Sequence, residues 1–123
     1  MAYQEVRTRR LWLALLGLAA ALPAADYKAG VARVAITPQK PIYLSGYASR
    51  NHPSEGVAHD LWAKALVLED PNGRRGVLVT MDLVGICREL SVAACNELKK
   101  KYGLEREAII LSVSHTHCGP VVR

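Results

Sequence analysis

The chain has no phenylalanine, few aromatic residues of any kind and only three cysteines. Three cysteines are too few for a disulfide scaffold, and the odd number leaves at least one thiol without a partner in the chain. No apolar run reaches the roughly 20 residues of a membrane-spanning helix, which excludes a multispanning membrane protein. The 123 residues are 50% hydrophobic and 22% charged, a composition typical of one globular domain rather than a disordered chain.

The first 25 residues have the layout of a secretory signal. Three arginines come first, an uncharged apolar run follows at 11–22, and small residues stand at 23–25. This order of basic, apolar and small residues is that of a cleaved leader. We therefore expect residues 1–25 to be a signal peptide and the mature protein to be secreted or periplasmic. A buried or membrane-anchoring N-terminal helix is the alternative.

The basic balance of the chain does not point to nucleic acid. Sixteen Lys and Arg stand against 11 Asp and Glu, but three of the arginines belong to the expected leader. The remaining basic cluster, at 99–101, lies at the end of an expected helix, where cations suit the helix dipole. Because no nucleic-acid-binding motif is present, we expect no nucleic-acid partner.

Apolar runs predict three strands in the first half of the mature chain. A short strand is expected at 31–36, and longer ones at 62–68 and 76–83. Between the last two lies Asp-Pro-Asn-Gly at 70–73, a strong turn signal because Pro presets its φ and Gly accepts positive φ. These two strands are predicted to form an antiparallel β-hairpin.

A helix and a final strand follow the hairpin. The helix is expected at 89–102, where apolar residues recur every fourth position, and Gly103 is expected to end it. A buried strand is predicted at 108–113. Strand, helix and strand in succession predict a βαβ crossover with two parallel strands. The fold class is therefore α/β with a mixed sheet. Because such a sheet would keep open apolar edges, we expect residues 26–123 to be a fragment of a longer protein.

Two histidines directly follow the last predicted strand. His115 and His117 are two residues apart, and in an extended backbone such residues point to the same side. Ligands of open α/β sheets bind beyond the carboxyl ends of the strands, so the position suits a site. Neutral imidazole is a good zinc ligand, but a catalytic zinc usually has three protein ligands. The pair is thus either part of a metal site or two polar loop histidines.

Other polar residues are weaker candidates. Asp82 ends the strand that should neighbour the last one, so it either orients an imidazole or caps a loop backbone. His52 and His59 are expected to be solvated loop residues. Cys118 beside the histidines is either a nucleophile or a metal ligand, or a small residue that fills a turn. Cys87 and Cys95 are about 12 Å apart if both lie on the helix, too far for a disulfide, and are expected to be packing residues.

From residue 29 to residue 120 the chain resembles the N-terminal part of the neutral/alkaline non-lysosomal ceramidase family. The motif of that family is His-Thr-His-Ser-Gly-Pro at the end of a strand, and this chain has His-Thr-His-Cys-Gly-Pro at 115–120. The other segments that carry the resemblance are Gly-Val-Ala at 30–32 with Ile-Thr-Pro at 36–38, Ser-Gly-Tyr at 45–47, Asp-Leu-Val-Gly at 82–85 and Lys-Tyr-Gly at 101–103.

The resemblance implies a zinc amidase that hydrolyses the N-acyl bond of ceramide to sphingosine and a fatty acid. By the same resemblance, His115 is a zinc ligand and His117 a catalytic residue that contacts the reacting centre. It also implies a ceramide-like lipid substrate and association with a membrane surface. Family enzymes are several times longer, so the resemblance implies that residues 26–123 are the truncated N-terminal part of a ceramidase-like domain. The remaining Zn²⁺ ligands of the family lie further downstream, and we therefore expect this chain alone to be inactive. Oligomeric state is not predicted.

Two other functions stay open. The chain is either a fragment without catalysis, or a scaffold whose substrate is another N-acyl lipid or a small amide. The reading frame after codon 123 would separate the fragment from an enzyme. Assays of ceramide against short N-acyl amides would separate the two substrate classes.

Overall fold

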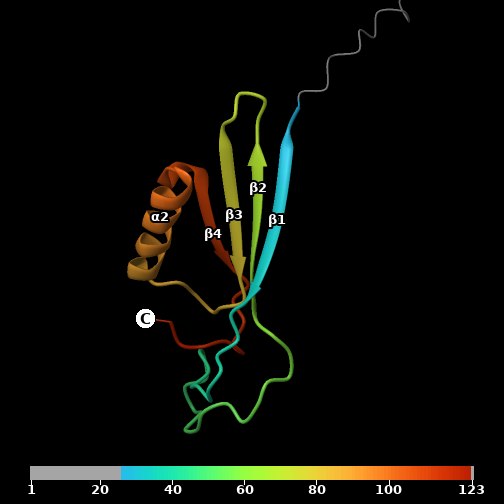
Figure 1. Ribbon diagram of the computed structural model, residues 1–123. Coiled ribbons are helices and arrows are strands. Elements are labelled where there is room, and N and C mark those ends of the chain that lie inside the picture. Colours follow the sequence, from blue (N-terminus) through green and yellow to red (C-terminus); the bar gives the residue numbers. More distant parts are fainter. Residues whose placement is uncertain (1–25, 123) are drawn as a thin grey trace, which may run out of the picture.

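The structure, a computed structural model, describes residues 26–122, which form one four-stranded sheet and one long helix (Figure 1). The strands lie side by side in chain order, β1-β2-β3-β4. The elements are β1 (Lys28–Ala35), β2 (Trp62–Glu69), β3 (Arg75–Met81), helix α2 (Arg88–Tyr102), the short 3₁₀ helix η2 (Arg106–Ala108) and β4 (Ile109–Val113).

The β2–β3 hairpin confirms the predicted turn. The strands pair antiparallel, with Glu69 opposite Arg75, and Gly73 takes a positive φ of 78°. The Asp70 carboxylate accepts hydrogen bonds from the backbone N–H groups of Asn72 and Arg74, both at 2.9 Å. It also accepts a hydrogen bond from the side-chain guanidinium of Arg74 at 2.6 Å. These bonds, the backbone N–H of Arg74 first, lower the pKa of Asp70 because they stabilise the ionised carboxylate.

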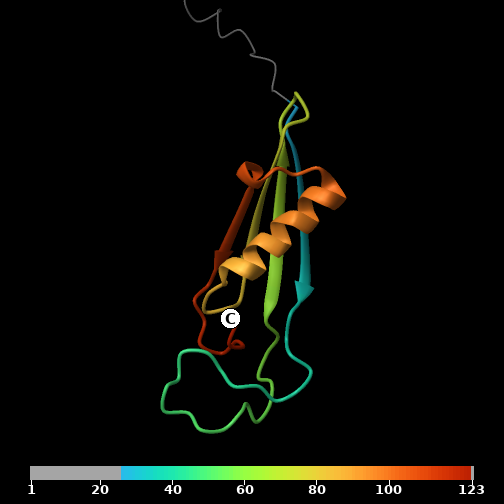
Figure 2. The same ribbon diagram turned by 90° about the vertical axis from the view of Figure 1, so that its left-hand side faces the viewer.

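The crossover from β3 through α2 to β4 is also as predicted, with β3 and β4 parallel. Figure 2 shows α2 lying across one face of the sheet. Beneath the helix is a small core formed by Val77, Cys95, Leu104 and Ile109. The helix ends as expected, because Gly103 takes a left-handed φ of 67° and donates its N–H to Lys99 O at 2.9 Å.

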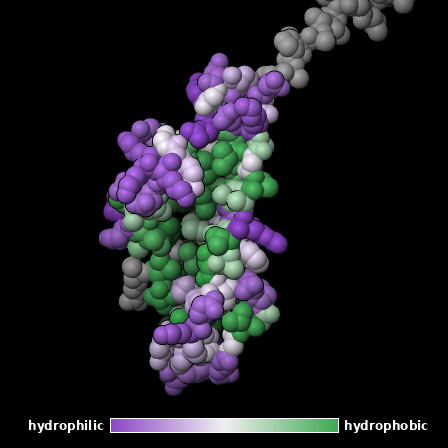
Figure 3. Space-filling view, viewed as in Figure 1, coloured by the Kyte–Doolittle hydropathy of each residue, from purple (hydrophilic) through white to green (hydrophobic). Residues whose placement is uncertain are grey.

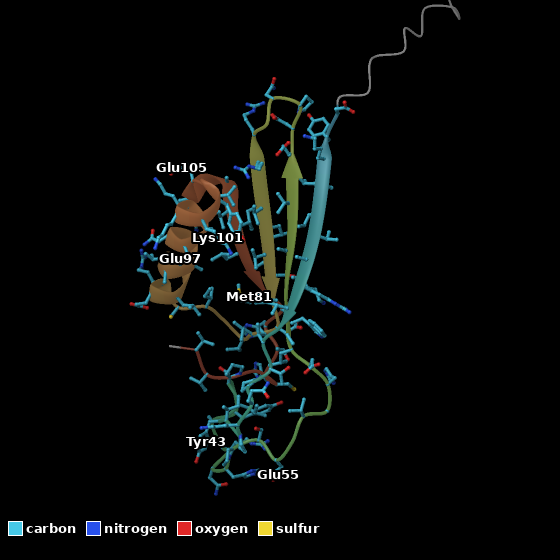
Figure 4. The ribbon with its side chains drawn as sticks, viewed as in Figure 1. Tyr43, Glu55, Met81, Glu97, Lys101 and Glu105 are labelled. Atoms are coloured by element: carbon cyan, nitrogen blue, oxygen red, sulfur yellow. The ribbon has the colours of Figure 1, made fainter. Side chains whose placement is uncertain are left out.

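Helix α2 does not cover all the apolar surface of its side. A groove runs between the apolar side of the helix and the sheet. Figure 3 shows hydrophobic surface between the helix and the strands. The polar rim of the groove includes Glu97 and Lys101 (Figure 4). The apolar residues that line it are Val79, Met81, Ile86, Leu90, Ala94, Leu98, Tyr102 and Leu111.

On the opposite face of the sheet, no helix from residues 26–122 is packed. Four aliphatic side chains stand in one cross-strand row on it, because each is the register partner of the next. The two at the ends of the row, Val31 and Ile110, are 84% and 61% exposed, while Leu66 and Leu78 between them are half-buried.

Two predicted strand bounds differ from the structure by more than one residue. The first strand begins at Lys28 rather than residue 31, because it pairs along its whole length with β2. Strand β3 ends at Met81 rather than residue 83, since the chain turns there and Leu83 donates its N–H to Met81 O at 2.9 Å. The predicted signal peptide at 1–25 lies outside the described residues. In the described part of the chain, no helix combines the length and apolar character needed to cross a bilayer.

Candidate functional site

All four strands have one end at the edge of the sheet that lies opposite the β2–β3 turn (Figure 1). At this edge Met81 pairs with Val113, and Ser114 donates its N–H to Met81 O at 3.0 Å. The segments that follow β3 and β4 therefore start side by side. We call the irregular segments at this edge, residues 36–61, 82–87 and 114–122, the loop end. Figure 4 places Tyr43 and Glu55 in the loop end.

The two histidines lie close together, but not for the predicted reason. The expectation of an extended backbone is wrong, because His115 has a left-handed φ of 57° and a turn begins at His117. The kink at His115 nevertheless brings the rings together, with centroids 5.5 Å apart and an interplanar angle of 60°. A left-handed φ costs an L-residue about 1–2 kcal/mol, and such strain is concentrated at functional sites.

Long-range contacts hold the histidine segment from two sides. On one side Ser45 donates its N–H to Gly119 O at 3.0 Å, and Leu44 and Pro120 form an antiparallel bridge. On the other side, a Cβ added at Gly119 would come within 3.0 Å of the backbone oxygen of Asp82. Ser45 and Gly119 are both buried. The turn after His117 thus packs between two segments distant in sequence, one at residues 44–45 and one at Asp82.

Asp82 acts on the backbone rather than on an imidazole. Its carboxylate accepts the N–H of Trp62 at 2.9 Å and the hydroxyl of Ser114 at 3.3 Å. These bonds join the start of β2 to the residue just before His115. Of the two roles considered for Asp82, the structure supports capping of a loop backbone.

The three cysteines are free, and each lies in a different setting. Cys95 is buried in the core under α2, and Cys87 stands half-buried at the N-cap of the helix. Cys118 is exposed and donates its backbone N–H to the Thr116 hydroxyl at 3.2 Å. A packing role for Cys95 and a turn position for Cys118 agree with the structure, whereas Cys87 does not belong to the core cluster.

The remaining histidines are exposed loop residues, as expected. His52 Nδ1 lies 3.3 Å from a Glu55 carboxylate oxygen. His59 lines a cavity of about 340 Å³, together with Thr37, Ile42, Leu61 and Cys118. Neither His115 nor His117 is among the residues that line this cavity.

The histidine pair fits part of a metal site. Imidazole nitrogens suit zinc, and two close rings can present donors to one region. Among residues 26–122, however, no group of three or more His, Cys, Asp or Glu side chains is placed to hold a metal ion. The described residues therefore supply at most an incomplete ligand set.

Residues 27–122 match the family model described as neutral/alkaline non-lysosomal ceramidase, N-terminal. The chain belongs to this ceramidase family. The match covers both the sheet and the loop end, including the histidine pair, and confirms the resemblance found in the sequence.

Individual ceramidases are similar over most of the chain. The neutral ceramidase of Oryza sativa subsp. japonica is 30% identical over 113 residues, covering 89% of this chain and 14% of the relative. The neutral ceramidase of Pseudomonas aeruginosa is 33% identical over 118 residues, covering 89% and 18%. A solved structure of the Pseudomonas aeruginosa enzyme matches with a TM-score of 0.72 and 31% identity, over 79% of this chain and 16% of that one. The chain therefore spans less than a fifth of the length of these ceramidases.

One part of the site was not assigned a role from the sequence. Gly46 and Tyr47 contact the ring of His117, although 70 positions separate Tyr47 from that histidine. The available signal was the Ser-Gly-Tyr segment at 45–47, where a glycine between larger residues marks a position that needs positive φ or a close approach.

Proposed function

We propose that this chain forms the N-terminal part of a zinc-dependent amidohydrolase that cleaves the N-acyl bond of a ceramide-like lipid. The observation that carries the proposal is the histidine pair at the carboxyl ends of β3 and β4, in a chain that matches the ceramidase family from residue 27 to residue 122. The names of the relatives support ceramide as the substrate.

The proposed reaction is the addition of water across the amide C–N bond. The hydroxyl of water bonds to the acyl carbon, the C–N bond breaks, and a proton reaches the amine nitrogen, giving a fatty acid and sphingosine. A bound zinc ion supplies Lewis-acid polarisation of the carbonyl and lowers the pKa of water. Within this chain we assign metal ligation to His115 and contact with the reacting centre to His117.

His117 has a role that neutral imidazole can perform. A ring N–H that points at the carbonyl oxygen stabilises the negative charge that develops there as the acyl carbon becomes tetrahedral. Such a donor is effective only when its direction is set before the reaction. The ring of His117 meets that condition, since it contacts both Tyr47 and Gly46.

His115 can supply one ligand, and a catalytic zinc usually has three from protein. The remaining donors of the proposed site must therefore come from polypeptide other than residues 26–122. The strained φ of His115 supports a functional role, because residues held in such backbone conformations cluster at active sites and ligand-binding positions.

The setting of the reaction follows from the substrate and the leader. A lipid with two apolar chains resides in a membrane, so the enzyme is proposed to act at a membrane surface. The signal-like residues 1–25 support secretion or export to the periplasm.

The test uses the complete gene product that carries this chain. We expect it to release fatty acid from ceramide, to lose activity on treatment with a chelator and to regain it with Zn²⁺. Faster hydrolysis of short N-acyl amides than of ceramide would point to the other substrate class. A folded product that hydrolyses neither substrate would refute the enzymatic proposal and favour a non-catalytic role.

A further inference from the structure

Gly46 lies directly against the ring of His117. A Cβ placed on this glycine would be 2.5 Å from His117 Nδ1, 2.6 Å from Cε1 and 2.8 Å from Cγ. A Cβ essentially never lies within 3.0 Å of a heavy atom to which it is not covalently linked. No L-residue with a side chain can therefore occupy position 46 while the ring stays where it is.

The three distances also show which part of the ring faces the glycine. Cγ, Nδ1 and Cε1 are consecutive ring atoms, and the Cβ position is almost equally far from all three. An approach in the plane of the ring toward Nδ1 would leave Cγ and Cε1 clearly farther away. Gly46 therefore lies under the flat face of the imidazole, and the in-plane hydrogen-bonding directions of the ring nitrogens stay clear of it.

Other contacts limit the remaining freedom of the ring. The Tyr47 ring meets it at 86° with centroids 5.5 Å apart, an edge-to-face arrangement. The backbone around Gly46 is tied to the backbone after His117 by the bond from Ser45 to Gly119 and by the Leu44–Pro120 bridge. Glycine and imidazole are thus held in register by contacts on both sides.

We propose that Gly46 is a positioning residue for His117. Because Gly46 has no side chain, the flat face of the His117 ring can lie against it, and the Tyr47 ring packs beside the imidazole. Together they select one ring orientation and keep the ring nitrogens available. This inference rests on the proposed function, in which His117 donates a hydrogen bond to the substrate carbonyl, and it names the residue that sets the direction of that bond.

Backbone conformation alone offers a rival explanation, because Gly46 has a φ of 84° that favours glycine in any case. The chain contains a matched control for this effect. Gly73 has a nearly equal φ of 78°, but a Cβ there would meet nothing within 4 Å. Gly46→Ala and Gly73→Ala thus share the backbone strain, but only Gly46→Ala also places a methyl group against the ring of His117.

The first test is NMR on the 123-residue chain itself, without added metal. In the wild type we expect a nuclear Overhauser contact between the Gly46 α-protons and a ring proton of His117. Gly46→Ala should shift the His117 ring resonances and remove the contact between the rings of His117 and Tyr47, whereas Gly73→Ala should leave both unchanged. Unchanged His117 resonances in Gly46→Ala, or an equal change in Gly73→Ala, would overturn the proposal. So would absence of the wild-type contact, which decides the matter even if Gly46→Ala does not fold.

The second test is kinetic and uses the complete gene product. Misplacing a catalytic group by about 1 Å costs up to roughly 100-fold in rate, so Gly46→Ala should lower kcat roughly 10- to 100-fold with KM within about twofold. Gly73→Ala should leave kcat unchanged. Equal kcat values for both variants would overturn the positioning role. A wild type that hydrolyses no ceramide would instead refute the proposed function. The NMR result would still decide whether Gly46 sets the orientation of the His117 ring.

Discussion

The sheet with helix α2 and the loop end with the two histidines are held together in different ways. In the sheet, each strand pairs with its neighbour over five to eight consecutive positions. In the loop end, single long-range bonds do this work, such as Ile36 N–H to Leu61 O at 2.8 Å and Leu61 N–H to Thr37 Oγ1 at 2.9 Å. We infer that the first region determines stability and the second determines chemistry, and the following predictions test that division.

The largest expected effect on stability lies in the sheet. Ile109 is 2% exposed and belongs to the core under α2, so Ile109→Ala should lower the free energy of unfolding by about 2–5 kcal/mol. The matched control is the next residue, since Ile110 is 61% exposed on the other face. Ile110→Ala should cost less than about 1 kcal/mol. Urea denaturation measures both, and equal losses would contradict the assignment of the core.

Removal of the His117 side chain should have the opposite effect, a large loss of activity with little loss of stability. His117→Ala is expected to reduce kcat on ceramide by about 10²–10³-fold, the usual loss for one donor to a developing oxyanion. Its free energy of unfolding should change by less than about 1 kcal/mol. His59→Ala, in the same region but exposed, should leave kcat unchanged. A large loss of stability in His117→Ala with little loss of kcat would reverse the proposed division.

The fold was more predictable than the site because its signals are local. The turn at 70–73, the period-four stripe of α2 and Gly103 each lie within a few residues of what they determine, and all appear in the structure as predicted. The length of β1 was underestimated, since its first residues are held by pairing with β2 rather than by an apolar pattern.

The site depends on contacts that no local pattern contains. His115 and His117 could be recognised as neighbours, but the left-handed backbone at His115 falls on a residue that is not glycine, and Gly46 meets the ring of His117 across 71 positions of the sequence. Asp82 was ambiguous for the same reason, because its partner Trp62 becomes its neighbour only when β2 and β3 pair.

Strain at His115 predicts a smaller effect on stability, inside the loop end. Because φ is 57°, His115→Gly should be more stable than His115→Ala by about 1 kcal/mol. At Ser114, which has no positive φ, the order should reverse, since glycine costs about 0.5–1 kcal/mol of backbone entropy. Thermal denaturation of the four variants provides the comparison. The same order at both positions would show that His115 is not strained.

The smallest expected effect is a dependence of stability on pH at the turn far from the site. The pKa of Asp70 is lowered in the folded chain, mainly by the N–H of Arg74. Its contribution to stability is therefore present above the unfolded pKa and is lost as the pH falls through the folded value. The stability difference between wild type and Asp70→Asn should shrink from pH 5 to pH 2. Glu97→Gln is the control, and a constant difference for Asp70→Asn would contradict the assignment.

The most direct test of the central claim is the zinc content of the complete gene product with His115→Ala. We predict that this variant remains folded but loses both bound zinc, measured by elemental analysis, and hydrolysis of ceramide. The control His52→Ala, which changes an exposed loop histidine, should keep both. Stoichiometric zinc retained in His115→Ala would show that His115 is not a ligand and would contradict the account.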